Sequence, residues 1–307
     1  MFESAVAAPR QAEGRAIDPI ALGPVDEVVV TILVDNSYDA LLADTGPARR
    51  ARVGRIPQVA AAQFEQGVTM PGLVAEHGFS ALVIVWRADS IHTLLFDTGI
   101  SPDGLATNIE RLGSDVGMIE AVVLGHGHFD HAGGFPGLIR LRGRRGLPLT
   151  LHPLVWTRRR LSLPGMAPFE LPTLSRAAIE SEGFTVVERR HPSILLDGMV
   201  LVTGEVDRTT DFELGMPFHE RFTGNGWAPD PEIVDDQALI LNLHGRGLVV
   251  LTGCGHAGAV NICRHALRLT GIDQLHALLG GFHLTGAAFE PIIELNRPTV
   301  PWTPSRR

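Results

Sequence analysis

The chain has 307 residues, of which 45% are hydrophobic and 20% are charged, and its net charge is −8 at neutral pH. This composition is typical of a globular protein with a sizeable core, and the acidic balance argues against binding to nucleic acids or anionic membranes. All 26 basic residues are arginines, which excludes lysine Schiff-base chemistry and a standard P-loop. We therefore expect a small-molecule substrate, with no nucleic-acid or membrane partner. The composition leaves the oligomeric state open.

The cysteine content and the hydropathy pattern bear on where the protein works. Cys254 and Cys263 are the only cysteines, too few for a disulfide framework, and this favours a reducing compartment. The chain shows neither an apolar signal segment nor an apolar run of about 18 residues, the length that a membrane-spanning helix needs. These features predict a cytoplasmic protein.

The first half of the chain is dominated by predicted strands. Residues 1–24 are rich in Ala, Pro and charge without a steady period, and we interpret them as a flexible N-terminal extension. Runs of β-branched and other apolar residues then predict strands, whereas 3.6-residue spacing with capping signals predicts helices. The strands are expected at 25–36, 79–88, 91–99 and 119–126, and the helices at 101–113 and 136–142.

The second half repeats this pattern and completes the predicted fold. Strands are expected at 147–153, 184–190, 199–206, 237–253 (a hairpin) and 275–284, and a helix at 259–271. Strands early and late, with helices between and after them, suit an α/β fold of two packed sheets with outer helices, a four-layer αβ/βα sandwich. We assign it to one domain, residues 25–297, followed by an irregular tail at 298–307. Residues 207–236 are long and rich in Gly, Pro and Asp, and we interpret them as a lid over the site.

The stretch GHGHFDHAGG at 125–134 carries the clearest chemical signal. The predicted strand before it delivers His126 to the edge of a sheet, and His128 follows two positions later, so both imidazoles can aim at one cation. Asp130 and His131 come just before a helix and can point to a second cation. Mixed imidazole and carboxylate ligands favour zinc, iron or manganese over calcium.

A second cluster of candidate residues lies late in the chain, in LTGCGHAGAVN at 251–261. Its glycines formally match the G-x-G-x-x-G fingerprint of a dinucleotide-binding turn, between a strand and a helix. Two features argue against that interpretation: the motif comes late in the chain, and it contains Cys254 and His256. The glycines would instead let His256 reach the metals, with the N-terminus of the following helix favouring an anion. His283 also ends a predicted strand, after two glycines.

Several other polar residues are weaker candidates. His283 could be a metal ligand or could contact the substrate, and Cys254 could be a ligand or a small buried residue. Glu205, Asp235 and Asp236 are alternative carboxylate donors. No pattern supports the remaining histidines, which we interpret as structural: His92, His152, His191, His219, His244, His265 and His276.

HGHFDH resembles the His-x-His-x-Asp-His signature of the metallo-β-lactamase fold superfamily, and LLFDTG at 94–99 resembles the strand that ends in a structural aspartate upstream of it. Narrower matches resemble the branch named for the archaeal dihydropterin–ribofuranosylaminobenzene phosphate synthase. They are VDN (34–36), EHGFSALV (76–83), TGEV (203–206), DDQALIL (235–241), LTGCGHAGAVN (251–261) and GGFHL (280–284). Asn36 and His77 fall within these matches and are expected to line the pocket. Cys254 stands where many members of the superfamily carry a metal-bridging aspartate.

The C-terminus departs from this branch. Its members usually continue to a His-Cys-Thr-Gly segment whose histidine resembles the last metal ligand, whereas this sequence reaches Arg307 without one. Either His283 completes the second metal position, or that position is incomplete.

Together, these motifs predict a metal-dependent hydrolase with two zinc ions, or with iron or manganese in their place. One ion would be held by His126, His128 and His256. The other would be held by Asp130 and His131, with His283 or an unassigned donor.

The metals would acidify a water molecule that attacks an ester, lactone or phosphoester. Asp130 is the predicted catalytic residue, which accepts or relays the proton of this water. The resemblance adds a transferase-like condensation on a pterin or phosphoribosyl compound. Two alternatives remain: a non-catalytic metal- or small-molecule-binding protein with an incomplete second site, and a nucleotide-binding oxidoreductase.

Overall fold

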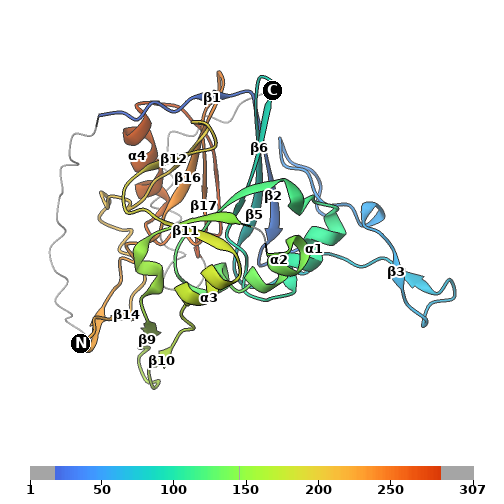
Figure 1. The fold of residues 1–307 in the computed structure, drawn as a ribbon, viewed down its shortest axis with the longest axis horizontal. Helices are drawn as coiled ribbons and strands as arrows, with labels where there is room; N and C mark the ends of the chain where they lie inside the picture. The colour runs from blue at the N-terminus through green and yellow to red at the C-terminus, as the bar shows by residue number, and fades with distance from the viewer. Residues whose placement is uncertain (1–17, 145, 285–307) are drawn as a thin grey trace.

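Two six-stranded sheets pack face to face with helices on their outer sides (Figure 1). The computed structural model describes residues 18–144 and 146–284. Within them the predicted αβ/βα sandwich is confirmed. The predicted tail at 298–307 lies outside the described residues, as do residues 1–17 and 285–297, so the expected domain limits stay a prediction.

The first sheet has the strand order β11-β8-β7-β6-β5-β2. Its strands are β2 (Glu27–Val34), β5 (Ser80–Arg87), β6 (Ser90–Phe96), β7 (Ile119–Val123), β8 (Leu147–Leu151) and β11 (Phe184–Glu188). Strands β6, β7, β8 and β11 run parallel, so their carboxyl ends share one edge. The outer helices of this half are α1 (Gly104–Leu112), α2 (Phe135–Arg142) and α3 (Arg176–Ser181).

The second sheet has the order β12-β13-β16-β17-β18, with β1 beside β16. Its strands are β1 (Pro24–Val25), β12 (Ser193–Leu195), β13 (Val200–Val202), β16 (Ala238–Leu243), β17 (Gly247–Thr252) and β18 (Leu275–Leu279). Helix α4 (Ala259–Thr270) covers its outer face through buried apolar side chains, among them Ile262 and Leu269. Strands β17 and β18 are parallel and end at the same edge.

Alternation along the strands builds the layered core. On β6, Leu94 and Phe96 face the interior between the sheets, whereas Leu95 faces the layer under the helices. Successive side chains of a strand point to opposite faces, so a strand buried on both sides must be apolar throughout. Burying one Leu or Phe side chain fully contributes about 1.5–3 kcal/mol to the stability of the fold. Apolar runs therefore mark the buried strands, which is why they predicted the two sheets.

A smaller four-stranded sheet, here called the outer sheet, has the order β10-β9-β14-β15. Its strands are β9 (Arg159–Leu161), β10 (Phe169–Glu170), β14 (His219–Phe222) and β15 (Trp227–Pro229). Strands β14 and β15 lie within residues 207–236, so the irregular lid that we expected there is in part regular structure.

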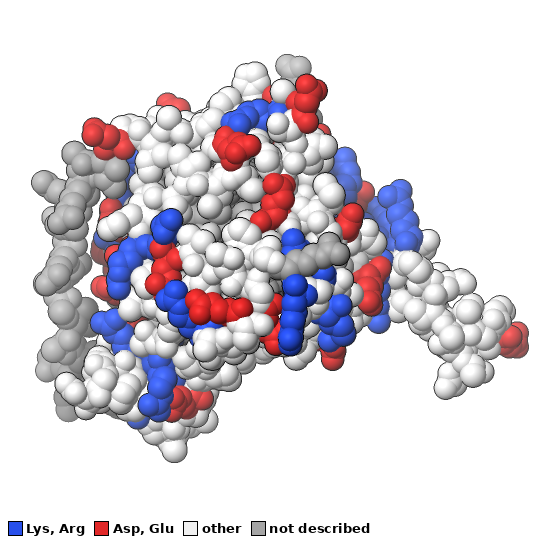
Figure 2. Space-filling view, in the orientation of Figure 1, with Lys and Arg blue, Asp and Glu red and all other residues white. Residues whose placement is uncertain are grey.

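A hairpin of β3 (Val59–Ala60) and β4 (Val68–Thr69) projects from the body (Figure 1). Figure 2 shows acidic and basic side chains interleaved on this face of the body, whereas the projecting arm is almost free of charge. Four short 3-10 helices complete the described elements: Val53–Arg55, Val116–Met118, Phe129–His131 and Pro153–Trp156.

Residues 18–24 differ from the flexible extension that we predicted. The amide of Ile20 donates to the carbonyl of Leu269 at 2.7 Å, Leu22 is buried, and Pro24 begins β1. Apolar contact with α4 therefore ties this segment to the fold. None of the helices in the described residues is long and apolar enough to cross a membrane.

Candidate metal centre

The candidate site forms where parallel strands of both sheets end. Asp97 follows β6, the loop of residues 125–131 (the His-rich loop) follows β7, residues 253–256 follow β17 and residues 280–284 follow β18. Because each parallel pair ends at one sheet edge, segments far apart in the sequence converge there.

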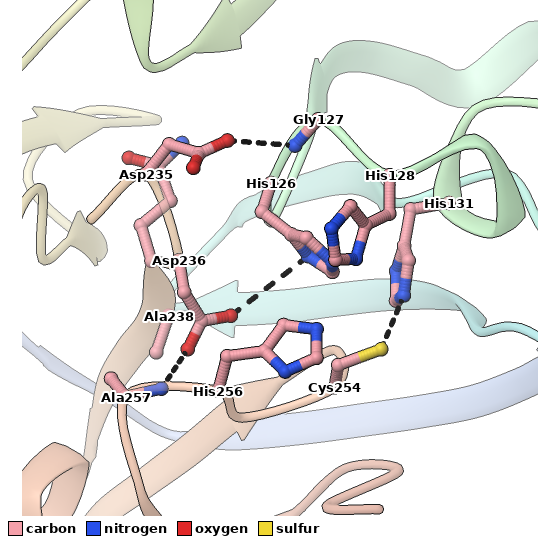
Figure 3. Close-up of polar contacts among 12 residues, drawn as sticks. His126, Gly127, His128, His131, Asp235, Asp236, Ala238, Cys254, His256 and Ala257 are labelled. Carbon is pink, nitrogen blue, oxygen red and sulfur yellow. Dashed lines mark hydrogen bonds and ion pairs between the residues drawn. The ribbon is translucent and has the colours of Figure 1, made fainter. Parts of the chain in front are cut away.

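Three histidines form the first cluster. His126, His128 and His256 each offer a ring nitrogen, and these atoms lie within 4.8 Å of one another. The ring of His256 lies 4.8 Å from that of His126 and 5.1 Å from that of His128, measured between centroids. Figure 3 shows the three rings pointing toward one another.

Buried polar atoms without hydrogen-bond partners make this cluster suited to a cation. Among the described residues, both ring nitrogens of His126, Nε2 of His256 and Oδ1 of Asp236 are buried without a hydrogen-bond partner. Burial lowers the pKa of His126, His128 and His256 well below the usual histidine value, so the rings are neutral. Buried polar atoms are rarely left unpaired, and neutral imidazole is the form that binds metal. The residues present therefore fit a metal ion.

A second cluster gathers around the thiol of Cys254. Its Sγ lies 2.7 Å from Nε2 of His131, 2.8 Å from Nε2 of His283 and 4.0 Å from Oδ2 of Asp130. The structure thus brings together the three residues predicted for the second position and adds the cysteine, which the sequence left undecided. A thiol among imidazoles and a carboxylate is a donor set that zinc accepts.

Asp97 fixes the His-rich loop through two hydrogen bonds. Its Oδ1 accepts the amide of Gly125 at 2.5 Å, and its Oδ2 lies 2.6 Å from Nδ1 of His131. A carboxylate accepts, so Nδ1 of His131 carries a proton, and Nε2 faces the thiol of Cys254. Burial by itself lowers the pKa of His131, but Cys254, Asp97 and Asp130 outweigh it and raise the pKa well above the usual histidine value. A Cβ on Gly253 would lie 2.7 Å from Oδ2 of Asp97; only glycine lets the two loops approach this closely.

His219, on β14 of the outer sheet, orients His128. Nδ1 of His219 lies 2.9 Å from the carbonyl of Asp230, which can only accept, so Nδ1 donates. Its Nε2 must then accept from Nε2 of His128, 3.0 Å away, which leaves Nδ1 of His128 free for a metal. Sequence reasoning missed this role, because a single histidine in an irregular stretch carries no local signal.

Comparison with known proteins identifies the fold family. Residues 78–263 match the model of the Metallo-beta-lactamase superfamily, which is more than half of the chain. The chain belongs to this superfamily. This confirms the resemblance read from the His-x-His-x-Asp-His motif.

Two relatives come from Methanocaldococcus jannaschii. One, named as 7,8-dihydropterin-6-methyl-4-(beta-D-ribofuranosyl)-aminobenzene-5'-phosphate synthase, is 28% identical over 71% of this chain and 74% of its own length. The other, an uncharacterised protein, is 26% identical over 70% of this chain and 75% of its own. A crystal structure described as a metal-dependent hydrolase of the beta-lactamase superfamily covers 87% of this chain and 81% of its own, with a TM-score of 0.60 and 23% identity. That similarity shows the fold.

Within this superfamily fold, Asp130 lies at the meeting point of both clusters. Burial by itself raises the pKa of its carboxyl, but the neighbouring imidazoles of His131, His128 and His77 outweigh it and hold the pKa below its usual range. His77 has a half-exposed side chain, and its Nε2 lies 3.4 Å from Oδ2 of Asp130. Its ring lies beside that of His283. The expectation that His77 lines the site agrees with this position. Asn36 belongs to neither cluster.

Two of the three alternative carboxylate donors, Glu205 and Asp235, do not face the metal centre. Glu205 pairs with His152 at 3.1 Å and Arg190 at 3.0 Å, away from both clusters. Asp235 accepts from Arg159 and from the amide of Gly127, so it supports the His-rich loop rather than facing the centre.

Asp236 is the one of these carboxylates that faces the imidazoles. Its Oδ2 accepts the amide of Ala257 at 2.7 Å, and its Oδ1 lies 3.9 Å from Nδ1 of His126. Burial raises its pKa to about 7.

The N-terminus of α4 does not offer the anion site that we expected behind His256. The carboxylate of Glu213 accepts the amides of Val260 and Asn261, both at 2.9 Å. Gly258 permits this approach, since a Cβ there would lie 2.3 Å from Cδ of Glu213. The place where a dinucleotide pyrophosphate would sit is filled by the protein itself, which counts against the oxidoreductase alternative.

Backbone strain marks the loop that carries His283. Phe282 and His283 adopt φ angles of 58° and 47°, in the left-handed region that disfavours residues with side chains. Such conformations cost on the order of 1 kcal/mol each and persist where surrounding contacts enforce them. The strained turn aims His283 at Cys254.

Proposed function

We propose that the protein is a metal-dependent hydrolase that holds two zinc ions and cleaves an ester, lactone or phosphoester. The first position would use His126, His128 and His256. The second would use the residues around Cys254, namely Asp130, His131, His283 and Cys254 itself. In this proposal His283 and the thiol complete the second position.

The observation that carries the proposal is the convergence, from both sheets, of buried ring nitrogens that have no hydrogen-bond partner. Both ring nitrogens of His126 and Nε2 of His256 lack partners among the described residues, although burying a polar group without one costs about 1–3 kcal/mol. When bound, zinc would supply Lewis acidity that polarises the scissile group and acidifies the attacking water.

The residues of the chain have defined tasks in this proposal. Asp130 is ionised, because its neighbouring imidazoles lower its pKa, and so its carboxylate can accept the proton of the attacking water. Asp97 and His219 contact Nδ1 of His131 and Nε2 of His128, so that the opposite ring nitrogens are directed toward the centre, where they would bind the metal ions.

The similarity to the Methanocaldococcus jannaschii synthase supports a second candidate. This is a condensation on a pterin or on a phosphorylated ribofuranosyl compound at the same centre. It requires a place for a phosphate near the metals, which the hydrolysis of an uncharged ester does not.

Metal analysis of the full chain, purified without chelator, tests the proposal. Plasma mass spectrometry should find about two equivalents of zinc in the wild type. His256→Ala should lose at least one, and it should lose hydrolysis of activated esters or phosphodiesters. His244→Ala, on an exposed turn outside both clusters, is the matched control and should retain both.

Three results would count against the proposal. Absence of metal from the wild type would overturn it. One equivalent without hydrolysis would favour the non-catalytic metal-binding alternative. Activity that survives His256→Ala would remove the assigned centre.

A further inference from the structure

A cavity of about 180 Å³ opens beside the metal centre, against Cys254, His256 and His283. Its remaining walls come from residues 213–216, which precede β14, from the first turn of α4 and from the loop after β18. The apolar side chains that these segments contribute are Leu214, Met216, Ala259, Phe282 and Leu284. Any substrate whose reacting bond reaches the metal centre from this side places its adjoining group in this cavity.

Among the described residues of the cavity wall, Glu213 is the only one with a carboxylate, and its oxygens are already hydrogen-bonded. Glu213 is buried, and its two oxygens accept the amides of Val260 and Asn261 at the N-terminus of α4 and the hydroxyl of Thr210. A helix N-terminus attracts a phosphate only while its amides are free. Here a phosphate would meet a carboxylate that already occupies them.

No cation compensates in the described part of the wall. The lining residues there include no arginine, and the sequence has no lysine. The charge of Arg208 acts to lower the pKa of Glu213. Its guanidinium, however, already donates to the carbonyls of His256, at 2.8 Å, and Glu232. Proteins bind phosphate with bidentate arginine or free main-chain amides, and the described part of the cavity wall provides neither.

From this geometry we infer that the cavity takes an uncharged, apolar acyl or aryl group, so that the part of the substrate next to the reacting bond carries no phosphate. This inference rests on the proposed hydrolase function and narrows it. A cavity of about 150 Å³ lined by apolar side chains holds a benzene molecule, so this one suits a phenyl ring or a short acyl chain. Leu214 is 63% exposed at the rim, and a longer chain would cover it.

Hydrolysis by the zinc-loaded full chain tests the inference with p-nitrophenyl acetate, butyrate and hexanoate, and with p-nitrophenyl phosphate and bis(p-nitrophenyl) phosphate. We expect kcat/KM to rise at least about tenfold from acetate to hexanoate, because each methylene buried in the cavity adds favourable binding free energy in the transition state. Leu214→Asp should abolish most of that rise. Leu41→Asp is the matched control, because Leu41 is also exposed but lies outside the cavity wall, and it should leave the rise intact.

Direct binding separates this inference from the proposed function. Titration calorimetry of the zinc-loaded protein with hexanoate and with 4-phosphonobutyrate, which carries a charged phosphonate in place of the apolar chain end, should show at least about tenfold tighter binding of hexanoate. Hydrolysis of none of the five esters would sink the proposed function, while the calorimetric preference still decides the inference. An unchanged kcat/KM from acetate to hexanoate, or tighter binding of 4-phosphonobutyrate, would overturn the inference and leave metal-dependent hydrolysis standing.

Discussion

The two sides of the metal centre are held by different means. The His-rich loop is fixed by hydrogen bonds: Asp97 and Asp235 accept two of its main-chain amides, and His219 holds the ring of His128. The loop of residues 280–284 is attached by a main-chain hydrogen bond, from the amide of Gly281 to the carbonyl of Gly253 at 2.7 Å, and it carries Phe282 and His283 in the strained left-handed region.

This difference predicts how each side responds when contacts are removed. Hydrogen bonds from buried partners fix ring orientation before any metal arrives, which is how outer contacts tune metal ligands. A strained turn persists only while its surroundings enforce it, and here the side chain that it presents contacts Cys254. We expect the His-rich loop to be preorganised and the 280–284 loop to depend on its contact with the thiol.

The largest effect is expected from Asp97→Asn. The amide keeps the volume of the carboxylate but loses its charge and one of its two acceptors, so the orientation of His131 is lost. Metal affinity should fall about 10–100-fold, measured by competition with a zinc chelator. Asp115→Asn is the control, since Asp115 also accepts a main-chain amide but lies on an exposed turn. An unchanged affinity in Asp97→Asn would show that the loop needs no such anchor.

Cys254→Ser tests the opposite side. We expect the second metal to bind about 30-fold more weakly, because a hydroxyl is a poorer zinc ligand than a thiolate. In cobalt-substituted protein the thiolate-to-cobalt charge-transfer band should disappear. Cys263→Ser removes the other buried thiol, which has no ligand-type neighbours in either cluster. A band that persists in Cys254→Ser would show that this sulfur is not a ligand.

His219→Ala tests a contact of the His-rich loop, and its effect on activity should be smaller. Loss of the acceptor at Nε2 of His128 should lower kcat about tenfold and alter the visible spectrum of the cobalt-substituted protein, with KM little changed. His219→Gln can place a carbonyl oxygen near the lost acceptor and should restore part of the activity. If alanine and glutamine behave alike, His219 only fills space.

The smallest effect concerns α4, which supports the loop of His256. Nδ1 of His265 accepts from Arg268 at 3.0 Å and from the amide of Asp207, and burial lowers its pKa to about 4. Since its unfolded pKa is about 6.5, the unfolded chain binds the extra proton first as the pH falls. The stability contributed by neutral His265 is therefore complete above about pH 6.5 and declines toward pH 4.

Between pH 7.5 and 5.5 this residue should account for a loss of about 1 kcal/mol in the free energy of unfolding. Urea unfolding of the wild type and of His265→Gln, which cannot titrate, measures the difference. Equal slopes with pH in the two proteins would contradict the assignment.

Sequence reasoning located the regular elements of the two sheets closely. The apolar run at 79–88 became β5 (Ser80–Arg87), and the helix expected at 259–271 became α4, ending before Gly271. Their signals are local, because they lie in side-chain alternation and capping residues. The strands of the outer sheet are only two to four residues long, too short for any period to register.

The same division runs through the candidate site. The sequence alone predicted the six ligand positions, because glycine-flanked histidines at strand ends leave a local pattern. Only the tertiary structure could decide that Cys254 lies between His131 and His283, that His219 orients His128 and that Glu213 fills the helix N-terminus. These contacts join residues 29 to 123 positions apart. No local pattern encodes such distances, because they arise when two packed sheets bring their strand ends to one place.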